Sequence, residues 1–143
     1  MPHARFQIRD AVAAALAGNN VTVEPSRQYP MTQEQMPRYL VYTIAESVDV
    51  GMSTADGIMR ELTLIVEAIT TADETTIDDD LDAHAVWIER ALNYTRLGGL
   101  ALRVTLSQSE MAIRTDGDIS LGVLTLTFNV TYRTLPTNPE TIT

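Results

Sequence analysis

The sequence predicts an α/β domain of the α+β type: a mostly antiparallel, twisted sheet of four to five strands with two helices packed on one face, in the order α-β-β-β-α-β-β. Three observations lead to this prediction. Two segments repeat apolar residues at helical spacing, others alternate apolar and polar residues as strands do, and an Asp-Gly pair separates the last two strand segments. Two helices cannot cover both faces of so long a sheet, so we expect both on one face and the other face free for a partner.

The first helix is expected between Ala4 and Ala17, where Ala-rich propensity supports an apolar face, and Gly18-Asn19-Asn20 ends it. Val21–Glu24 is expected to be a short strand that Pro25 stops. The following stretch, Ser26–Pro37, contains two prolines and no periodicity, so it is expected to be a loop.

The middle of the chain predicts two strands. Arg38–Ser47 is apolar at nearly all positions and rich in aromatic and β-branched residues, which is typical of a central strand buried on both faces. Asp49–Gly57 contains mostly small residues and is expected to be a connector. Ile58–Thr70 alternates again, which predicts a second long strand.

A second helix is expected after Thr75 or Thr76, either of which is a suitable N-cap, and Gly98-Gly99 ends the segment. Three carboxylates in its first turn, residues 78–80, match the positive end of the helix dipole. Its apolar stripe comprises Ile77, Leu81, Ala85, Ile88 and Leu92.

The stretch Leu100–Leu135 predicts a long antiparallel hairpin that turns at Thr115–Asp118. Leu102, Val104 and Leu106 alternate with polar residues before the turn. Sixteen residues of the second strand would extend roughly 54 Å, whereas a compact chain of this length is roughly 37 Å across. Either the hairpin bends, or its tip protrudes as an arm.

The apolar positions change parity on both strands of this hairpin. Apolar residues before the turn are even-numbered up to Leu106, whereas Met111 and Ile113 are odd-numbered; after the turn, odd positions give way to even ones at Leu124. The change predicts β-bulges or twist, with a distal half that contacts a partner. The alternative is that both faces of the hairpin are buried in places.

Composition indicates one domain, residues 1–143, with a flexible tail over 136–143. We expect no export signal and no transmembrane helix, because no apolar run approaches about 20 residues. The absence of cysteine excludes disulfides and thiol chemistry. The net charge of −9, with ten arginines as the basic residues, argues against wrapping of nucleic acid.

No catalytic residue, cofactor site or metal site is predicted. The acidic run of residues 78–82 precedes His84, but successive helical positions point in different directions and do not converge on one ion. A solvated helix start is favoured there, with His84 as a core or interface histidine. Asp116-Gly117-Asp118 lacks the other ligand positions of a calcium loop. Neither a nucleophile motif nor a Gly-rich phosphate loop is present.

Methionines in the predicted loops indicate an adaptable contact surface, with Tyr29 beside Met31. The alternative is that these loops fold back and bury them. Together with the distal hairpin, they give a candidate interface of Tyr29, Met31, Met52, Met111, Ile113, Asp116, Asp118, Ile119 and Leu121.

Three motifs carry a resemblance to a known family. Arg5–Leu16 reads RFQIRDAVAAAL, Ser26–Pro30 (SRQYP) precedes Met36–Thr43 (MPRYLVYT), and the last long strand has the form V-x-Y-x-T at residues 130–134. In these motifs the chain resembles the tail terminator or tail completion proteins of long-tailed phages, the class that includes the minor tail protein U family.

The resemblance implies a structural protein of the virion, located at the head-proximal end of the tail. Such proteins assemble as a hexameric ring that caps the tail tube, stops its polymerisation and docks to the head connector. Genomic DNA passes through the lumen without specific binding, no membrane is involved, and no catalytic residue is implied. A head-closure or joining protein of the neck is the alternative. The alternatives from another functional class are a metal-dependent hydrolase and a small ligand-binding domain.

Overall fold

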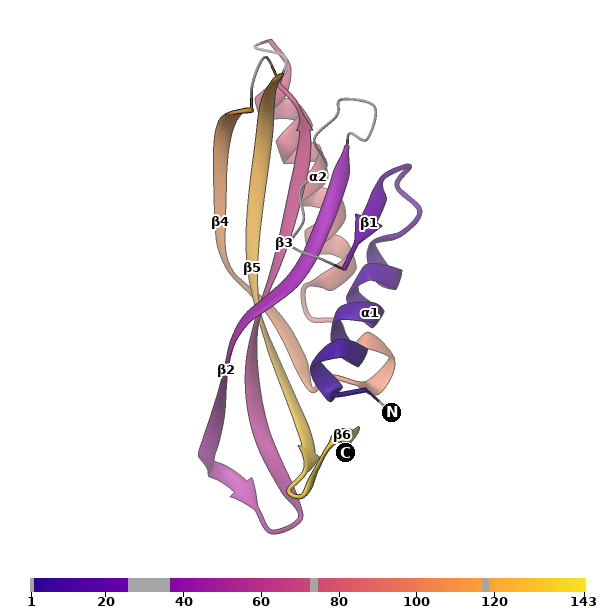
Figure 1. Cartoon of the computed structure of the whole chain (residues 1–143), viewed down its shortest axis with the longest axis vertical. Coiled ribbons are helices and arrows are strands. Elements are labelled where there is room, and N and C mark those ends of the chain that lie inside the picture. Colours follow the sequence, from indigo (N-terminus) through magenta and orange to yellow (C-terminus); the bar gives the residue numbers. More distant parts are fainter. Residues whose placement is uncertain (1, 26–36, 73–74, 117–118) are drawn as a thin grey trace.

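The computed structural model describes residues 2–25, 37–72, 75–116 and 119–143, and within these ranges it confirms the α+β fold (Figure 1). Two helices pack on one face of a six-stranded mixed sheet. The elements are α1 (Ala4–Leu16), β1 (Thr22–Glu24), β2 (Arg38–Thr54), β3 (Gly57–Thr71), α2 (Ile77–Leu92), the 3-10 turn η2 (Leu97–Gly99), β4 (Arg103–Asp116), β5 (Ile119–Leu135) and β6 (Asn138–Ile142). No helix in these ranges is both long and apolar enough to cross a bilayer.

The sheet has the order β1-β2-β3-β5-β4, with β6 paired to β5. The short β1 runs parallel to β2, whereas the other pairs are antiparallel. The pairing of β3 with β5 is unbroken from Ile58↔Thr134 to Thr71↔Leu121. These two strands therefore form the centre of the sheet.

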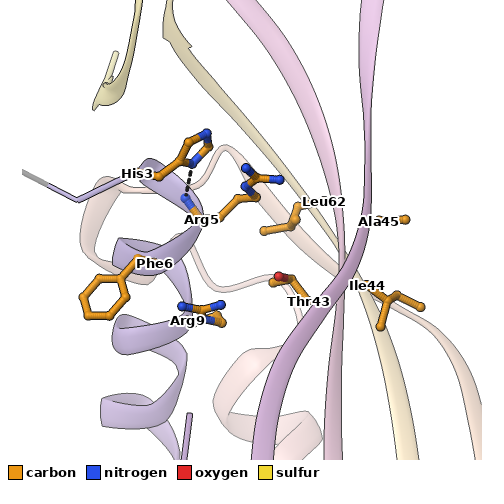
Figure 2. A pocket seen from close by; sticks show the side chains of 8 residues that line it. All are labelled: His3, Arg5, Phe6, Arg9, Thr43, Ile44, Ala45 and Leu62. Atoms are coloured by element: carbon orange, nitrogen blue, oxygen red, sulfur yellow. Dashed lines mark hydrogen bonds between the residues drawn. The ribbon is translucent and has the colours of Figure 1, made fainter. Parts of the chain in front are cut away.

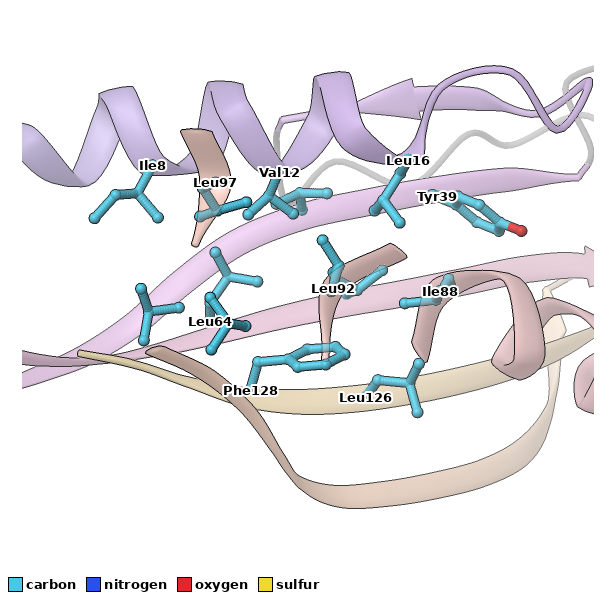
Figure 3. Packing of buried hydrophobic residues seen from close by; sticks show 14 of the residues in the cluster. Ile8, Val12, Leu16, Tyr39, Leu64, Ile88, Leu92, Leu97, Leu126 and Phe128 are labelled. Carbon is cyan, nitrogen blue, oxygen red and sulfur yellow. The ribbon is translucent and has the colours of Figure 1, made fainter. Parts of the chain in front are cut away.

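The main core lies between the helices and the even-numbered residues of β3 and β5 (Figure 3). Helix α1 buries one residue per turn along a single face. Helix α2 buries four of the five residues of its predicted stripe, and the fifth, Ala85, is partly buried. Leu81 and Ile88 are buried as expected. The strand residues that meet the helices include Leu62, Leu64, Val66, Leu124, Leu126, Phe128 and Val130.

A smaller apolar cluster lies on the opposite face of the sheet and joins Leu40, Ile69, Leu121 and Val123. Because β5 keeps one register with β3, its odd and even residues face opposite sides of the sheet. The parity change in β5 therefore reflects burial on both faces, the alternative left open by the sequence. Leu121 is buried in its own chain, so its assignment to a free contact surface is wrong.

In β4 the parity change has the other predicted cause, a register shift between Leu106 and Gln108. The extra residue places Met111 opposite Leu124, on the helix-covered side of the sheet. Leu102, expected to be a core residue of this strand, lies before its first residue and is 44% exposed.

Two segments differ from the sequence prediction. The expected connector, Asp49–Gly57, instead continues β2 to Thr54, because pairing with β3 extends to Thr54↔Gly57 after a register irregularity. The expected flexible tail contains β6, which pairs with the end of β5. Its Glu140 carbonyl also accepts a hydrogen bond of 2.7 Å from Gln7 Nε2, which fastens the segment to α1.

The long strands are accommodated by twist and by extension of the sheet beyond the helices (Figure 1). The protruding part is the β2–β3 hairpin together with the end of β5. At the other end of the sheet, where an arm was predicted, the first part of β5 lies beside α2, and Gly122 packs directly against Ile77. The arm is therefore at the opposite end of the sheet from the predicted one.

Truncation of Leu81 or Ile88 to Ala should lower the free energy of unfolding by about 2–5 kcal/mol, because each leaves a cavity under α2. Val86→Ala, on the same helix but 47% exposed, should change it by less than about 0.5 kcal/mol. Denaturant unfolding measures all three. Equal stability of the three variants would contradict the assigned buried face.

Candidate functional site

The strongest candidate for an interaction surface is the distal hairpin, defined as Val48–Met59 of β2 and β3. It extends beyond the helical layer (Figure 1), and Val48, Val50 and Met52 are 48%, 80% and 61% exposed. Large apolar side chains clustered on a projecting element are typical of a protein contact site. Met52 was expected on such a surface, whereas Val48 and Val50 were missed, although their alternation with polar residues is visible in the sequence.

The distal hairpin is held in shape by its own contacts. Asp49 Oδ1 accepts a hydrogen bond of 3.1 Å from the Met52 amide, and Ser53 Oγ accepts one of 3.0 Å from the Met59 amide. Gly57 lies against the guanidinium of Arg133, which occupies the space that a Cβ would need. Only glycine therefore fits this position without displacing Arg133. These contacts give the hairpin a defined shape within the single chain.

A partly buried polar network joins the distal hairpin to the rest of the sheet. Arg60 Nη1 lies 2.9 Å from Glu46 Oε1, and Arg60 Nε donates a 3.0 Å hydrogen bond to Thr134 Oγ1. The hydroxyl of Tyr132 donates to the other oxygen of Glu46. Burial, and then the neighbouring Glu46, raise the pKa of Tyr132, which keeps this hydroxyl protonated as a donor. The network fixes three strands relative to one another.

A pocket of about 420 Å³ lies between α1 and β2 (Figure 2). It opens where β2 contains an extra residue between Thr43 and Ala45, a bulge that bends the strand. Arg5 and Arg9 extend from α1 towards β2 and provide its positive charge. The complete lining is His3, Arg5, Phe6, Arg9, Thr43, Ile44, Ala45 and Leu62.

The cations of this pocket form no ion pair with any described residue. The Nε of Arg9 is buried without a hydrogen-bond partner, and its guanidinium carbon lies 5.6 Å from the ring centre of Phe6. His3 Nδ1 accepts a 3.0 Å hydrogen bond from the Arg5 amide and so caps α1. Burial, and then the charge of Arg5, lower the pKa of His3. The pocket is thus suited to an anionic group.

His84 lies at the interface between α2 and the sheet, as expected. Its Nδ1 is 2.7 Å from the hydroxyl of Tyr39, which also accepts a hydrogen bond of 3.2 Å from Asn19. Burial lowers the pKa of His84, and a neutral ring can accept the proton of Tyr39. The described residues contain no group of three side chains placed to hold a metal ion, and residues 78–80 and 82 are exposed on α2.

Of the other predicted interface residues, the structure places Met111 and Ile113 on β4, apart from the distal hairpin. Met111 and Ile113 are 57% and 64% exposed on β4, where they line a shallow pocket beside the start of α2. Three of the predicted residues lie outside the described residues: Tyr29, Met31 and Asp118. For Asp116 and Ile119 only the backbone is described.

Comparison with known proteins gives little beyond this geometry. No family model matches the chain, and no curated protein matches it. A solved chain described as "Virion of native gene transfer agent (GTA) particle" is 20% identical, with a TM-score of 0.46 over 90% of this chain and 92% of that chain. A TM-score of this size does not establish a common fold, so no function follows from it.

The depressed pKa of His84 leads to a pH-dependent stability. Folding disfavours the protonated ring, so the stability present above the ordinary pKa of 6.5 should be lost progressively as the pH falls. Between about pH 7.5 and 5, the free energy of unfolding should decrease. His84→Gln should reduce this slope, and His3, whose pKa is also lowered, should contribute to what remains. Equal slopes for the wild-type protein and the variant would contradict the assignment.

Proposed function

We propose that this chain is a structural protein of a phage-like virion, and specifically a tail terminator. It assembles as a ring at the head-proximal end of the tail, and the resemblance implies that the ring is a hexamer. There it would cap the tail tube, end tube polymerisation and provide the docking surface for the head connector. The observation that carries the proposal is the distal hairpin with its exposed apolar residues.

Where the structure describes them, the motifs that resemble the tail terminator family form parts of α1, β2 and β5, whereas SRQYP lies outside the described residues. RFQIRDAVAAAL forms α1, and the YLVYT segment forms the first half of β2. Val130, Tyr132 and Thr134 are all buried in β5. The resemblance therefore concerns residues that build the helix-covered sheet, and it supports a shared architecture more than a shared binding site.

Surface chemistry supports an assembly role. A projecting hairpin that contacts a different surface of the next copy gives a head-to-tail interface, and such interfaces close into rings when the rotation permits. The net charge of −9 suits a channel through which DNA slides without adhering. We propose no catalytic role, and the assembly needs none.

Removal of the distal hairpin tests the proposal. Asp49 and Met59 are cross-strand partners, so replacement of residues 50–58 by Asn-Gly closes a short hairpin on an existing pair. We expect a nearly unchanged melting temperature together with loss of rings and of tube capping, seen by negative-stain imaging with purified tail tubes.

The matched control replaces residues 114–121 by Asn-Gly at the other end of the sheet. This variant loses buried Leu121, so its melting temperature should fall. If the variant without residues 50–58 assembled fully, the distal hairpin would not be part of the interface. A wild-type protein that forms no ring and caps no tube would refute the function itself.

A further inference from the structure

The pocket between α1 and β2 is a concentration of positive charge on an acidic protein. Ten arginines face nineteen acidic residues in the whole chain, yet Arg5 and Arg9 project into one space together with His3 (Figure 2). Neither arginine forms an ion pair with a described residue. Arg5 is exposed, but the Nε of Arg9 is buried without a hydrogen-bond partner, which is costly, so an anionic group that enters the pocket would satisfy it.

The distal hairpin carries the complementary chemistry. Its tip has exposed Asp56, while residues 48–57 contain no basic residue. Asp49 is also exposed, but one of its oxygens already binds the Met52 amide. Exposed Val50 and Met52 lie on the same element as these acids. The pocket has a matching apolar neighbour in Phe6, which is 48% exposed.

A chain cannot fill its own pocket with this tip. Ile44 lines the pocket and Thr54 ends the same strand, and ten residues of strand span about 30 Å. The hairpin also runs away from α1 rather than back towards it (Figure 1). The acidic tip therefore reaches such a pocket only on another molecule.

We propose that the pocket between α1 and β2 receives the distal hairpin of a second copy of this chain. The Asp56 carboxylate of one copy binds Arg5 and Arg9 of the next, while Val50 and Met52 pack against Phe6. The combination of cations with an exposed aromatic ring favours a peptide that carries both acids and apolar side chains over a free phosphate. The contact is head-to-tail and deepens the ring assembly proposed above, on which it rests.

Charge reversal tests the contact. Arg5 and Asp56 are both exposed, so Arg5→Glu and Asp56→Arg should leave the melting temperature unchanged. Each should weaken self-association by about tenfold or more, because like charges then meet. The double variant should regain most of the loss. Asp78→Arg, an exposed reversal on α2, is the matched control and should not affect association. Sedimentation velocity, with and without tail tubes, measures all four.

Disulfide trapping gives a second, direct measurement, because the chain contains no cysteine. Phe6→Cys combined with Ala55→Cys should form covalent oligomers under mild oxidation, whereas either substitution alone should form no ladder of oligomers. Suppose that Arg5→Glu assembles into normal rings and that the double cysteine variant forms no covalent oligomers. This contact would then be refuted, and the ring proposal would remain intact. Phosphate binding that Arg5→Glu abolishes without affecting assembly would also overturn this contact. A wild-type protein that never assembles refutes both proposals.

Discussion

The pairing of β3 with β5 is the interaction on which the rest of the structure depends. It runs without a shift from Ile58↔Thr134 to Thr71↔Leu121, so it fixes which residues face the helices over the full length of the sheet. A shift of one residue would turn Phe128 and Leu64 away from α1 and α2 and expose them. The same register places Leu121 and Val123 on the opposite face, where they meet Leu40 and Ile69. Both apolar clusters therefore follow from one ladder of backbone hydrogen bonds.

Much of the fold could be predicted because its signals are local. The stripe through Leu81 and Ile88 identified α2, and the parity change before Met111 indicated a bulge that β4 does contain. The failures all depend on pairing or packing with another element, which the residues of a segment do not show by themselves. Asp49–Gly57 has the composition of a loop and is extended only because β3 pairs with it. Residues 138–142 are ordered by β5 and α1, and Leu121 is buried by β2 and β3.

The candidate site was predicted less completely than the fold, for a physical reason. Exposure of Met52, Met111 and Ile113 agrees with a contact surface, but the sequence does not show which of them share an element that projects from the body. The pocket has no recognisable pattern in the sequence, because Arg5 and Arg9 look like ordinary residues on the polar face of a helix. Their grouping depends on a bulge after Thr43, which bends a strand whose sequence around that point gives no sign of an interruption.

The network of Glu46, Arg60 and Tyr132 lies where the helix-covered part of the sheet ends. Separation of this partly buried ion pair and of its hydrogen bonds is costly, so bending between the body and the distal hairpin is resisted at this junction. The distal hairpin should consequently move as a rigid lever, with its angle to the body nearly fixed. In a closed assembly built through such a lever, its angle to the body would fix the rotation from each copy to the next, and hence the number of copies in the circle. Residues buried far from any contact would then govern stoichiometry.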